Sequence, residues 1–234
     1  MFREAFDYPL AGESRERLLV GGLLTLGGVI VFLPAIPLQG YFVAVIRSVV
    51  AEEADPPAFE DWEALSLDGL KALLVAVPYA IVATVVVAFA VFVLTAGLVA
   101  FRTRGGDPTS LAILGIAGLL TLVAAVVFTA ATYLYPIALA HFAVEDSVEA
   151  AFDLRTVAAI AWNREYAVAW LFVSTVGFVL AAVAGALSLV LVGFFATFYL
   201  QVAFVALFAR GYERGRESAE SRLSDSVHAE SSDL

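Results

Sequence analysis

Cysteine is absent from the 234 residues of this chain, and the chain has only two histidines and one lysine. The lack of thiols excludes disulfides and thiolate metal sites. His141 and His228 are too few and too far apart in sequence for a metal cluster, so we expect no metal and no cofactor. Charged residues are also scarce, at 15% of the chain, against about a quarter in soluble domains. Most of this chain is therefore not suited to face water.

Hydrophobic residues make up 62% of the chain, and the mean hydropathy is +0.91. The apolar runs are continuous rather than alternating, which favours helices over a β-barrel as the membrane-crossing elements. We predict an all-α, polytopic transmembrane helical bundle of about six spans in three hairpins. The expected transmembrane domain covers residues 18–212, between a cytoplasmic head at 1–17 and a disordered acidic tail at 213–234. The predicted spans are residues 18–33, 38–51, 71–101, 109–140, 166–190 and 194–210, and the connectors are residues 52–70 and 141–165.

The first two apolar runs allow two interpretations, because Pro34 and Pro37 separate them. One is a single helix with a proline kink, and the other is a hairpin of two short helices. A single rod from Leu18 to Ala51 would reach roughly 50 Å, well beyond a hydrocarbon core of about 30 Å. The hairpin places eleven basic residues on one side of the membrane and two on the other, whereas one kinked helix divides them eight to five. The positive-inside rule favours the hairpin, with both termini cytoplasmic.

The two connectors carry the same order of residue types and are predicted to be amphipathic segments at the membrane surface. In each, a basic residue or histidine is followed by an acidic patch, an Ala-Phe-acidic triplet, a tryptophan and a second basic residue. Interfacial aromatic residues and snorkelling cations anchor such segments among lipid headgroups. Two explanations of the match stay open, an internal duplication and the shared need for interfacial aromatic residues. The residues expected at the interface or in contact with lipid are Arg47, Phe59, Trp62, Lys71, Phe152, Trp162 and Arg164.

Other polar residues are expected to cap helices, to bind a partner or to line a cavity. Asp68 and Asp107 are placed to cap the third and fourth spans, and Asp146 with Glu149 resembles a capping box. The acidic residues of the first connector form either a solvated face or a binding surface for a protein partner; they are Glu52, Glu53, Asp55, Glu60, Asp61, Glu63 and Asp68. A small polar cavity, or simple interhelical hydrogen bonds, would explain Tyr133, Tyr135, Tyr199 and Gln201.

Residues 40–73 contain G-Y-x-V-x-x-x-R, then P-P-x-F-x-D-W, then D-G-L-K-A-L. This pattern resembles a family of multi-span membrane proteins of unknown function from halophilic archaea. The similarity extends through AAFDLR in the second connector and covers nearly the whole chain apart from the tail. Ala44 departs from the family pattern, which has a second basic residue there, and so weakens a lipid-headgroup role for that face. The resemblance implies a fold and a membrane setting, and it implies no activity.

The net charge of −10 argues against nucleic acid as a partner, because its phosphates would be repelled. No Asp, Glu, Lys or Arg lies in the middle of a predicted span, whereas ion-coupled transporters usually keep one there. No P-loop, nucleophile elbow or HExxH motif occurs, so we expect no enzymatic activity. The sequence favours a structural, lipid-interacting or partner-organising protein of the cell membrane. The alternative is a transporter or channel subunit for a small uncharged or hydrophobic solute, and a membrane-embedded lipid enzyme comes third.

Overall fold

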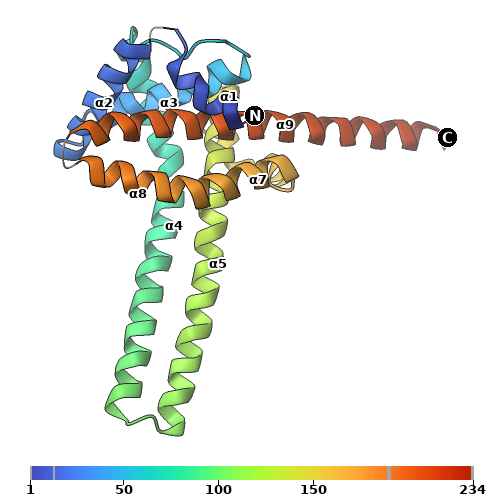
Figure 1. The fold of residues 1–234 in the computed structure, drawn as a ribbon. Coiled ribbons are helices and arrows are strands. Elements are labelled where there is room, and N and C mark those ends of the chain that lie inside the picture. The colour runs from blue at the N-terminus through green and yellow to red at the C-terminus, as the bar shows by residue number, and fades with distance from the viewer. Residues whose placement is uncertain (1, 13, 189–190, 233–234) are drawn as a thin grey trace. The chain divides into compact units, whose positions relative to one another are not determined.

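The computed structural model describes residues 2–12, 14–188 and 191–232. Within these ranges all regular structure is helical and no strand is present (Figure 1), so the all-α prediction is confirmed. The α-helices are α1 (Phe2–Asp7), α2 (Ser14–Ile30), α3 (Ala35–Val50), α4 (Trp62–Thr103), α5 (Pro108–Glu145), α6 (Leu154–Ala161), α7 (Arg164–Phe172), α8 (Phe178–Leu187) and α9 (Val192–Ser232). The described ranges also contain the 3₁₀ turns η1 (Tyr8–Leu10) and η2 (Ala150–Phe152) and the π-helical turn η3 (Val173–Gly177).

Four helical segments are long and apolar enough to cross a membrane, which indicates a membrane protein. They are Trp62–Thr103, Pro108–Glu145, Arg164–Leu187 and Val192–Ser218. The first two of the six predicted spans correspond to α2 and α3, which have 17 and 16 residues. Neither is among the helices long enough to cross a membrane.

The two apolar runs before the first connector form separate helices. α2 ends at Ile30, α3 begins at Ala35, and residues 31–34 between them are not helical. Pro34 has no amide hydrogen with which to continue α2, and Pro37 lies in the first turn of α3, where amides need no intrahelical acceptor. α2 and α3 contact each other, and both pack against α9. The chain is thus broken at the prolines rather than continuous through them.

The chain divides into two compact units. The larger unit comprises Met1–Val75 and Pro136–Leu234, and the smaller unit comprises Ala76–Tyr135. α4 and α5 contribute to both, and the division falls near Pro78 and directly before Pro136. A proline inside a helix removes one backbone hydrogen bond, so both helices are weakened where the units meet in sequence.

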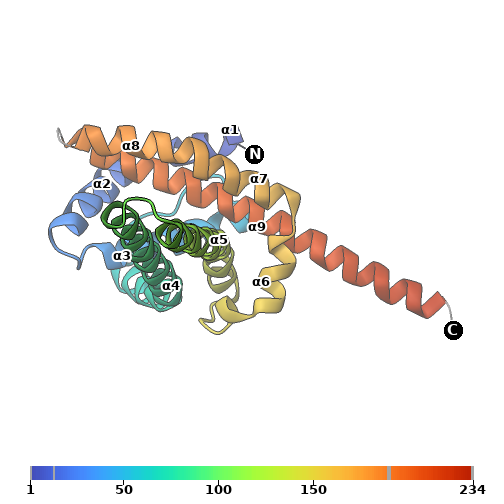
Figure 2. The same cartoon turned by 90° about the horizontal axis from the view of Figure 1, so that it is seen from below.

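Helix α9 is the centre of the larger unit. It contacts α1, α2, α3, α6, α7 and α8, and Figures 1 and 2 show α8 running beside it. Phe198 of α9 is 1% exposed, and its ring centroid lies 5.6 Å from that of Tyr41 and 6.2 Å from that of Phe59. A Cβ on Gly21 of α2 would lie 2.2 Å from the Phe198 ring. Glycine at position 21 therefore lets α2 approach the central helix.

Helices α3 and α4 touch through their backbones at two glycines. A Cβ on Gly40 would lie 1.7 Å from the carbonyl oxygen of Leu65, and one on Gly69 would lie 1.9 Å from that of Ile36. Neither carbonyl can move without disturbing its own helix. Small residues permit such close helix contact in membrane proteins, and here both glycines are required for it.

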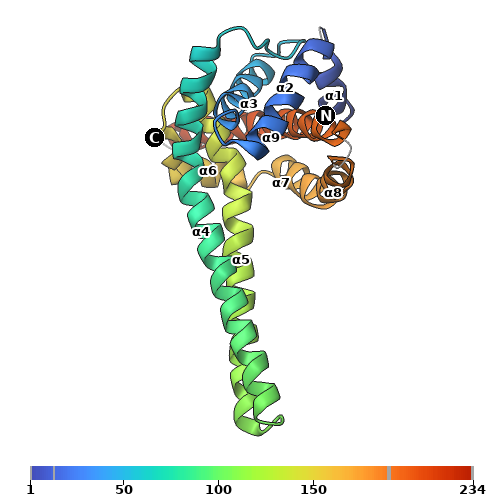
Figure 3. The same ribbon diagram turned by 90° about the vertical axis from the view of Figure 1, so that its left-hand side faces the viewer.

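In the smaller unit, α4 and α5 lie side by side (Figure 3). A Cβ on Gly97 would lie 2.8 Å from the Cβ of Ala117, so small residues again set the approach. The turn between the helices has Gly105 and Gly106 at φ 66° and 77°, a region that glycine adopts without strain. The Asp107 carboxylate accepts a hydrogen bond from the Ser110 amide at 2.7 Å, which confirms the predicted cap of α5.

The first connector is shorter than predicted, because α4 begins at Trp62 rather than at Lys71. The carboxylate of Asp61 accepts a hydrogen bond from the Ala64 amide at 2.9 Å and so caps the helix. Asp68 lies inside α4 and is not the cap. Residues 62–70 are therefore continuous with the span instead of forming a separate surface segment.

The second connector contains η2 and α6 between the end of α5 at Glu145 and the start of α7. Asp153 caps α6: its carboxylate accepts hydrogen bonds from the Thr156 hydroxyl at 2.6 Å and from the Arg155 amide at 3.1 Å. The Thr156 hydroxyl holds the pKa of Asp153 below its usual value. Asp146, expected in a capping box, instead ends α5 with φ 49° and directs its carboxylate to Arg47 and Lys71.

The segment from residue 213 onward was predicted to be disordered, whereas in the structure α9 continues through it to Ser232. Polar contacts with α7 and its cap hold the first part of this extension. Arg214 pairs with Glu165 at 2.6 Å, and the Asn163 side-chain amide donates a hydrogen bond to the Ser218 hydroxyl at 3.2 Å. The segment lacks apolar periodicity, so sequence reasoning had no signal for a helix there.

We expect Gly69→Ala to destabilise the protein, although alanine is the better helix former by about 1 kcal/mol. The new Cβ must displace the Ile36 carbonyl, and such overpacking costs about 1–3 kcal/mol. Gly115→Ala is the matched control, because nothing lies within 4 Å of a Cβ at that position in α5. Thermal unfolding in detergent micelles should show a lower Tm for Gly69→Ala and an equal or higher Tm for Gly115→Ala. Equal Tm values for the two variants would contradict the backbone contact.

Candidate functional site

A cluster of ion pairs joins the two connectors of the larger unit. Its members are Arg47, Asp68, Lys71 and Asp146, which we call the ion-pair cluster. The Arg47 guanidinium donates to Asp68, to Asp146 at 3.0 Å and, through Nε, to the carbonyl of Ala143 at 2.8 Å. Lys71 Nζ lies 3.3 Å from Asp146 and 3.9 Å from Asp68. Arg47 thus connects α3, to which it belongs, with α4 and the end of α5.

Burial differs strongly between the two carboxylates of this cluster. The Asp68 side chain is 16% exposed and that of Asp146 is 67% exposed, with Arg47 between them at 35%. Because a carboxylate removed from water requires a partner, the contact with Asp68 matters more for stability than the one with Asp146. The Ala143 carbonyl is in the last turn of α5, where the helix itself supplies no amide donor. Arg47 therefore also caps α5.

Acidic residues with left-handed backbone follow the helices that enter both connectors. Glu52 follows α3 at φ 57°, and Asp146 follows α5 at φ 49°. Each lies five residues after the position aligned between the two connectors, Arg47 in one and His141 in the other. The next elements differ, since the first connector leads directly into α4 while the second forms α6. The backbone likeness therefore concerns the first residues of each connector, and the internal duplication stays a prediction.

The aromatic residues predicted at the interface lie in different surroundings. Phe59 stacks on Tyr41 with ring centroids 4.1 Å apart, so part of its surface is covered by protein. Trp62 lies 5.9 Å from Phe59 and is 45% exposed. In the second connector Phe152 is 42% exposed and Trp162 is 84% exposed.

The basic residues predicted at the interface also separate into two kinds. Arg47 and Lys71 belong to the ion-pair cluster. Arg164, in the first turn of α7, is exposed beside Trp162. The second connector thus presents an apolar and a basic side chain outward, while the first uses its cations within the protein.

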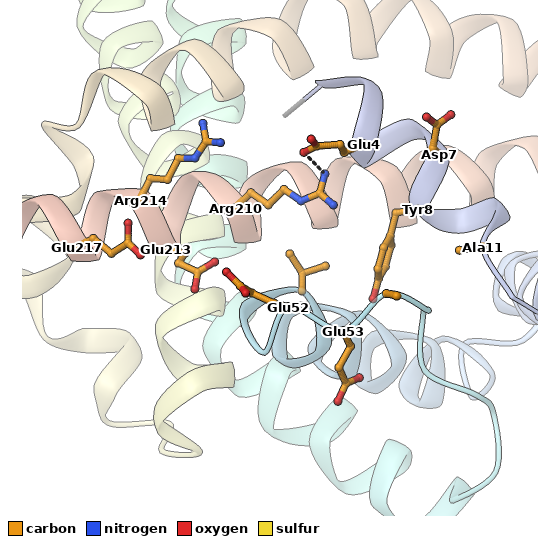
Figure 4. A pocket seen from close by; sticks show the side chains of 12 residues that line it. Glu4, Asp7, Tyr8, Ala11, Glu52, Glu53, Arg210, Glu213, Arg214 and Glu217 are labelled. Carbon is orange, nitrogen blue, oxygen red and sulfur yellow. Dashed lines mark ion pairs between the residues drawn. The ribbon is translucent and has the colours of Figure 1, made fainter.

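An acidic cavity of about 640 Å³ lies between the N-terminal segment, the start of the first connector and α9 (Figure 4). Six acidic residues and two arginines are among the residues that line it, together with Tyr8, whose burial raises the pKa of its phenol. Arg210 is directed toward Glu4, with 3.6 Å between the charged groups. In the described ranges, no group of three or more His, Asp or Glu side chains is arranged to hold a metal ion. The lining residues are Glu4, Asp7, Tyr8, Ala11, Val49, Glu52, Glu53, Ala54, Arg210, Glu213, Arg214 and Glu217.

The four residues predicted to line a polar cavity lie in four different settings. Tyr135 faces Tyr79, at 5.7 Å between ring centroids, in a groove of about 290 Å³ lined mainly by alanine. Tyr133 borders another groove, with Thr129. Tyr199 donates a hydrogen bond to the Phe6 carbonyl at 2.6 Å. Gln201 has a buried side-chain oxygen for which the described residues supply no donor. A shared polar cavity stays a prediction.

Sequence reasoning missed the roles of Asp68, Asp146 and His141. Both aspartates were interpreted as helix caps, because capping depends on local spacing whereas their ion pairs join residues 21 and 99 positions apart. His141 is 9% exposed and its Nδ1 lies 2.8 Å from the Tyr212 hydroxyl, a contact between residues 71 positions apart that local sequence rules do not predict. The D-G-L-K spacing, which places Asp68 and Lys71 one turn apart, was the only local signal available.

Replacing Arg47 by alanine should lower the free energy of unfolding by about 1–3 kcal/mol, because Asp68 and the Ala143 carbonyl lose their donor. Asp146→Asn should cost less, about 0–1 kcal/mol, since that side chain is largely exposed. Thermal unfolding in detergent micelles measures both. Arg3→Ala is the control, because the pair of Arg3 with Asp7 is 94% and 70% exposed. If Arg47→Ala proved as harmless as Arg3→Ala, the ion-pair cluster would not hold the connectors together.

Comparison with known proteins places the chain in a family without assigning it an activity. The model of the family described as "Protein of unknown function (DUF4013)" matches residues 23–189, well over half of the chain. The matched range includes the whole ion-pair cluster and both connectors. No curated protein and no solved structure matches. The expectation of a family of unknown function is confirmed, and the chain belongs to the DUF4013 family.

Proposed function

We propose that this protein is a multi-pass component of the cell membrane, without enzymatic activity, that acts as a structural, lipid-interacting or partner-organising element. The observation that carries this proposal is the uncovered apolar surface of α4 and α5 in the smaller unit. Phe92 is 70% exposed, Leu122 is 62% exposed and Val126 is 63% exposed. Water-soluble monomers rarely expose continuous apolar surfaces of this size, whereas lipid acyl chains cover them without cost.

The second connector supports contact with lipid headgroups. Trp162 and Leu154 expose 84% and 69% of their surface, and Arg155 and Arg164 are exposed beside them. Tryptophan with neighbouring cations is typical of the boundary between acyl chains and headgroups. In the proposed arrangement this connector lies on the cytoplasmic surface of the membrane.

The acidic cavity supports a role in organising a partner. It gathers Glu52 and Glu53 of the first connector with Glu213 and Glu217 of α9, so a protein segment rich in lysine or arginine would be attracted there. The net charge of −10 also suits a cytoplasm of high salt, as in halophilic archaea. High salt would screen exposed charges, and a partner would then depend on close contacts in the cavity.

The topology can be tested with single cysteines, because the chain has none of its own. We expect cysteines at Gly106 and Ser218 to react with a membrane-impermeant maleimide from opposite sides, with position 218 cytoplasmic. Position 14 should react from the same side as position 218. A cysteine at Leu33 should react from the side of Gly106 if α2 and α3 cross the membrane, and from the cytoplasmic side if only four segments cross. Reaction of positions 106 and 218 from one side would contradict the proposed topology, which has an odd number of crossings between them.

The lipid contact of the second connector can be tested by fluorescence quenching. In a variant with Trp62→Phe and Trp170→Phe, Trp162 should be quenched by lipids labelled near the headgroup more than by deeply labelled lipids or aqueous iodide. The matched variant that keeps only Trp62 should show weaker lipid quenching, since Phe59 covers part of that ring. Strong quenching of Trp162 by iodide would place the connector in water and would favour the partner-binding role.

A further inference from the structure

The N-terminal segment is an amphipathic helix rather than a simple charged head. Phe2, Ala5 and Phe6 follow the i, i+3, i+4 spacing of residues on one helix face, while Arg3 and Asp7 lie on the other. Ala5 is 0% exposed, and the side chains of Arg3 and Asp7 are 94% and 70% exposed. α1 therefore has one face packed against the protein, with Ala5 buried and Phe2 and Phe6 partly buried, and one face exposed to solvent.

This face of α1 occupies an apolar groove between α7 and α9. Ala5 is packed in one buried cluster with Ala169 of α7 and Leu207 of α9, both 0% exposed. The ring centroid of Phe2 lies 4.6 Å from that of Phe172. The two phenylalanines thus enter the groove on either side of the small alanine.

Phe6 completes the fit from the second turn of the helix. Its ring is edge-on to Phe172 and to Phe204, with centroids 6.3 Å apart in each case. Edge-to-face pairs of this geometry are favourable beyond the area that they bury. The Tyr199 hydroxyl donates to the Phe6 carbonyl at 2.6 Å, which satisfies one of the last carbonyls of α1.

α1 is too short to be stable as a helix by itself. It has six residues, far fewer than the roughly 12–15 at which an isolated helix becomes marginally stable in water. Its fold must therefore come from the groove, as in complexes where a short amphipathic helix binds a preformed apolar surface. The ion pair of Glu4 with Arg210 is 3.6 Å long and its carboxylate is 67% exposed, so it adds little.

We propose that the groove between α7 and α9 is a helix-binding surface whose occupant is the chain's own N-terminal segment, bound reversibly and exchangeable with a second copy of that segment. Binding is carried by Phe2 and Phe6 on either side of Ala5. This inference does not depend on the proposed membrane role, because every contact in it belongs to the larger unit.

Occupation of the groove also determines one wall of the acidic cavity. α1 and η1 supply Glu4, Asp7 and Tyr8 to its lining, and α9 and the first connector supply most of the rest (Figure 4). Release of the segment removes these three side chains and frees Arg210 from Glu4. A ligand that binds in the cavity therefore changes the affinity of α1 for the groove. By linkage, bound α1 changes the affinity of the cavity for that ligand by the same factor.

The test is a binding measurement with a fluorescent peptide of residues 2–12 and full-length protein in detergent micelles. The variant Phe2→Ser/Phe6→Ser should bind the peptide at least roughly tenfold more tightly than the unaltered chain, whose groove is filled. The variant Arg3→Ser/Asp7→Ser, altered on the free face of the same helix, should behave like the unaltered chain. A peptide carrying the two serines in place of Phe2 and Phe6 should bind neither protein.

A second measurement keeps the result clear if the phenylalanine variant folds poorly. In an otherwise unaltered chain, cysteines in place of Ala5 and Ala169 should form an intramolecular disulfide, and excess peptide should slow its formation several-fold. A peptide that fails to distinguish the phenylalanine variant from the unaltered chain, together with a disulfide rate unaffected by peptide, overturns the proposal. The segment would then be a fixed part of the core.

Discussion

The hydrogen bonds of the Arg47 guanidinium are the interaction on which the arrangement of the connectors depends. Its three nitrogens donate to Asp68 in α4, to the Ala143 carbonyl in the last turn of α5 and to Asp146, which follows α5. Arginine suits this position because its planar fork can serve several acceptors at fixed angles, whereas a lysine ammonium would reach fewer of them. Without this cation, Asp68 would be a largely buried carboxylate whose remaining ion pair among the described residues is the longer one with Lys71, at 3.9 Å.

Close backbone packing makes that contact geometrically possible. Gly40 and Gly69 bring α3 against α4. Asp68 directly precedes Gly69, and Arg47 lies about two turns after Gly40, so this approach places Asp68 within reach of Arg47. The Tyr41, Phe59 and Phe198 rings fill the space next to the glycine contact. Packing and charge are therefore coupled, since a shift of α3 away from α4 would lengthen the ion pair as well as open the aromatic cluster.

The sequence was sufficient to predict what depends on local composition. Continuous apolar runs correctly indicated helices long enough to cross a membrane, and Asp107 before Pro108 correctly marked a helix start. The start of α4 was missed because Trp62–Leu70 reads as an amphipathic surface segment, although it continues the span. The ion-pair cluster was missed because its partners are far apart in sequence and no local rule relates Arg47 to Asp146.

The distribution of charge explains why a lipid-facing role and a partner-binding role are compatible in one chain. Residues 76–135 contain only Arg102, Arg104 and Asp107 as charged groups, all at one turn, so the smaller unit offers lipid an almost uncharged surface. The larger unit holds the remaining charges, and it satisfies some of them internally through Arg47 and Arg214. The carboxylates of the acidic cavity outnumber the arginines beside them. That local excess of negative charge is the feature of the larger unit that a basic partner would neutralise, whereas the smaller unit has no comparable polar surface to offer.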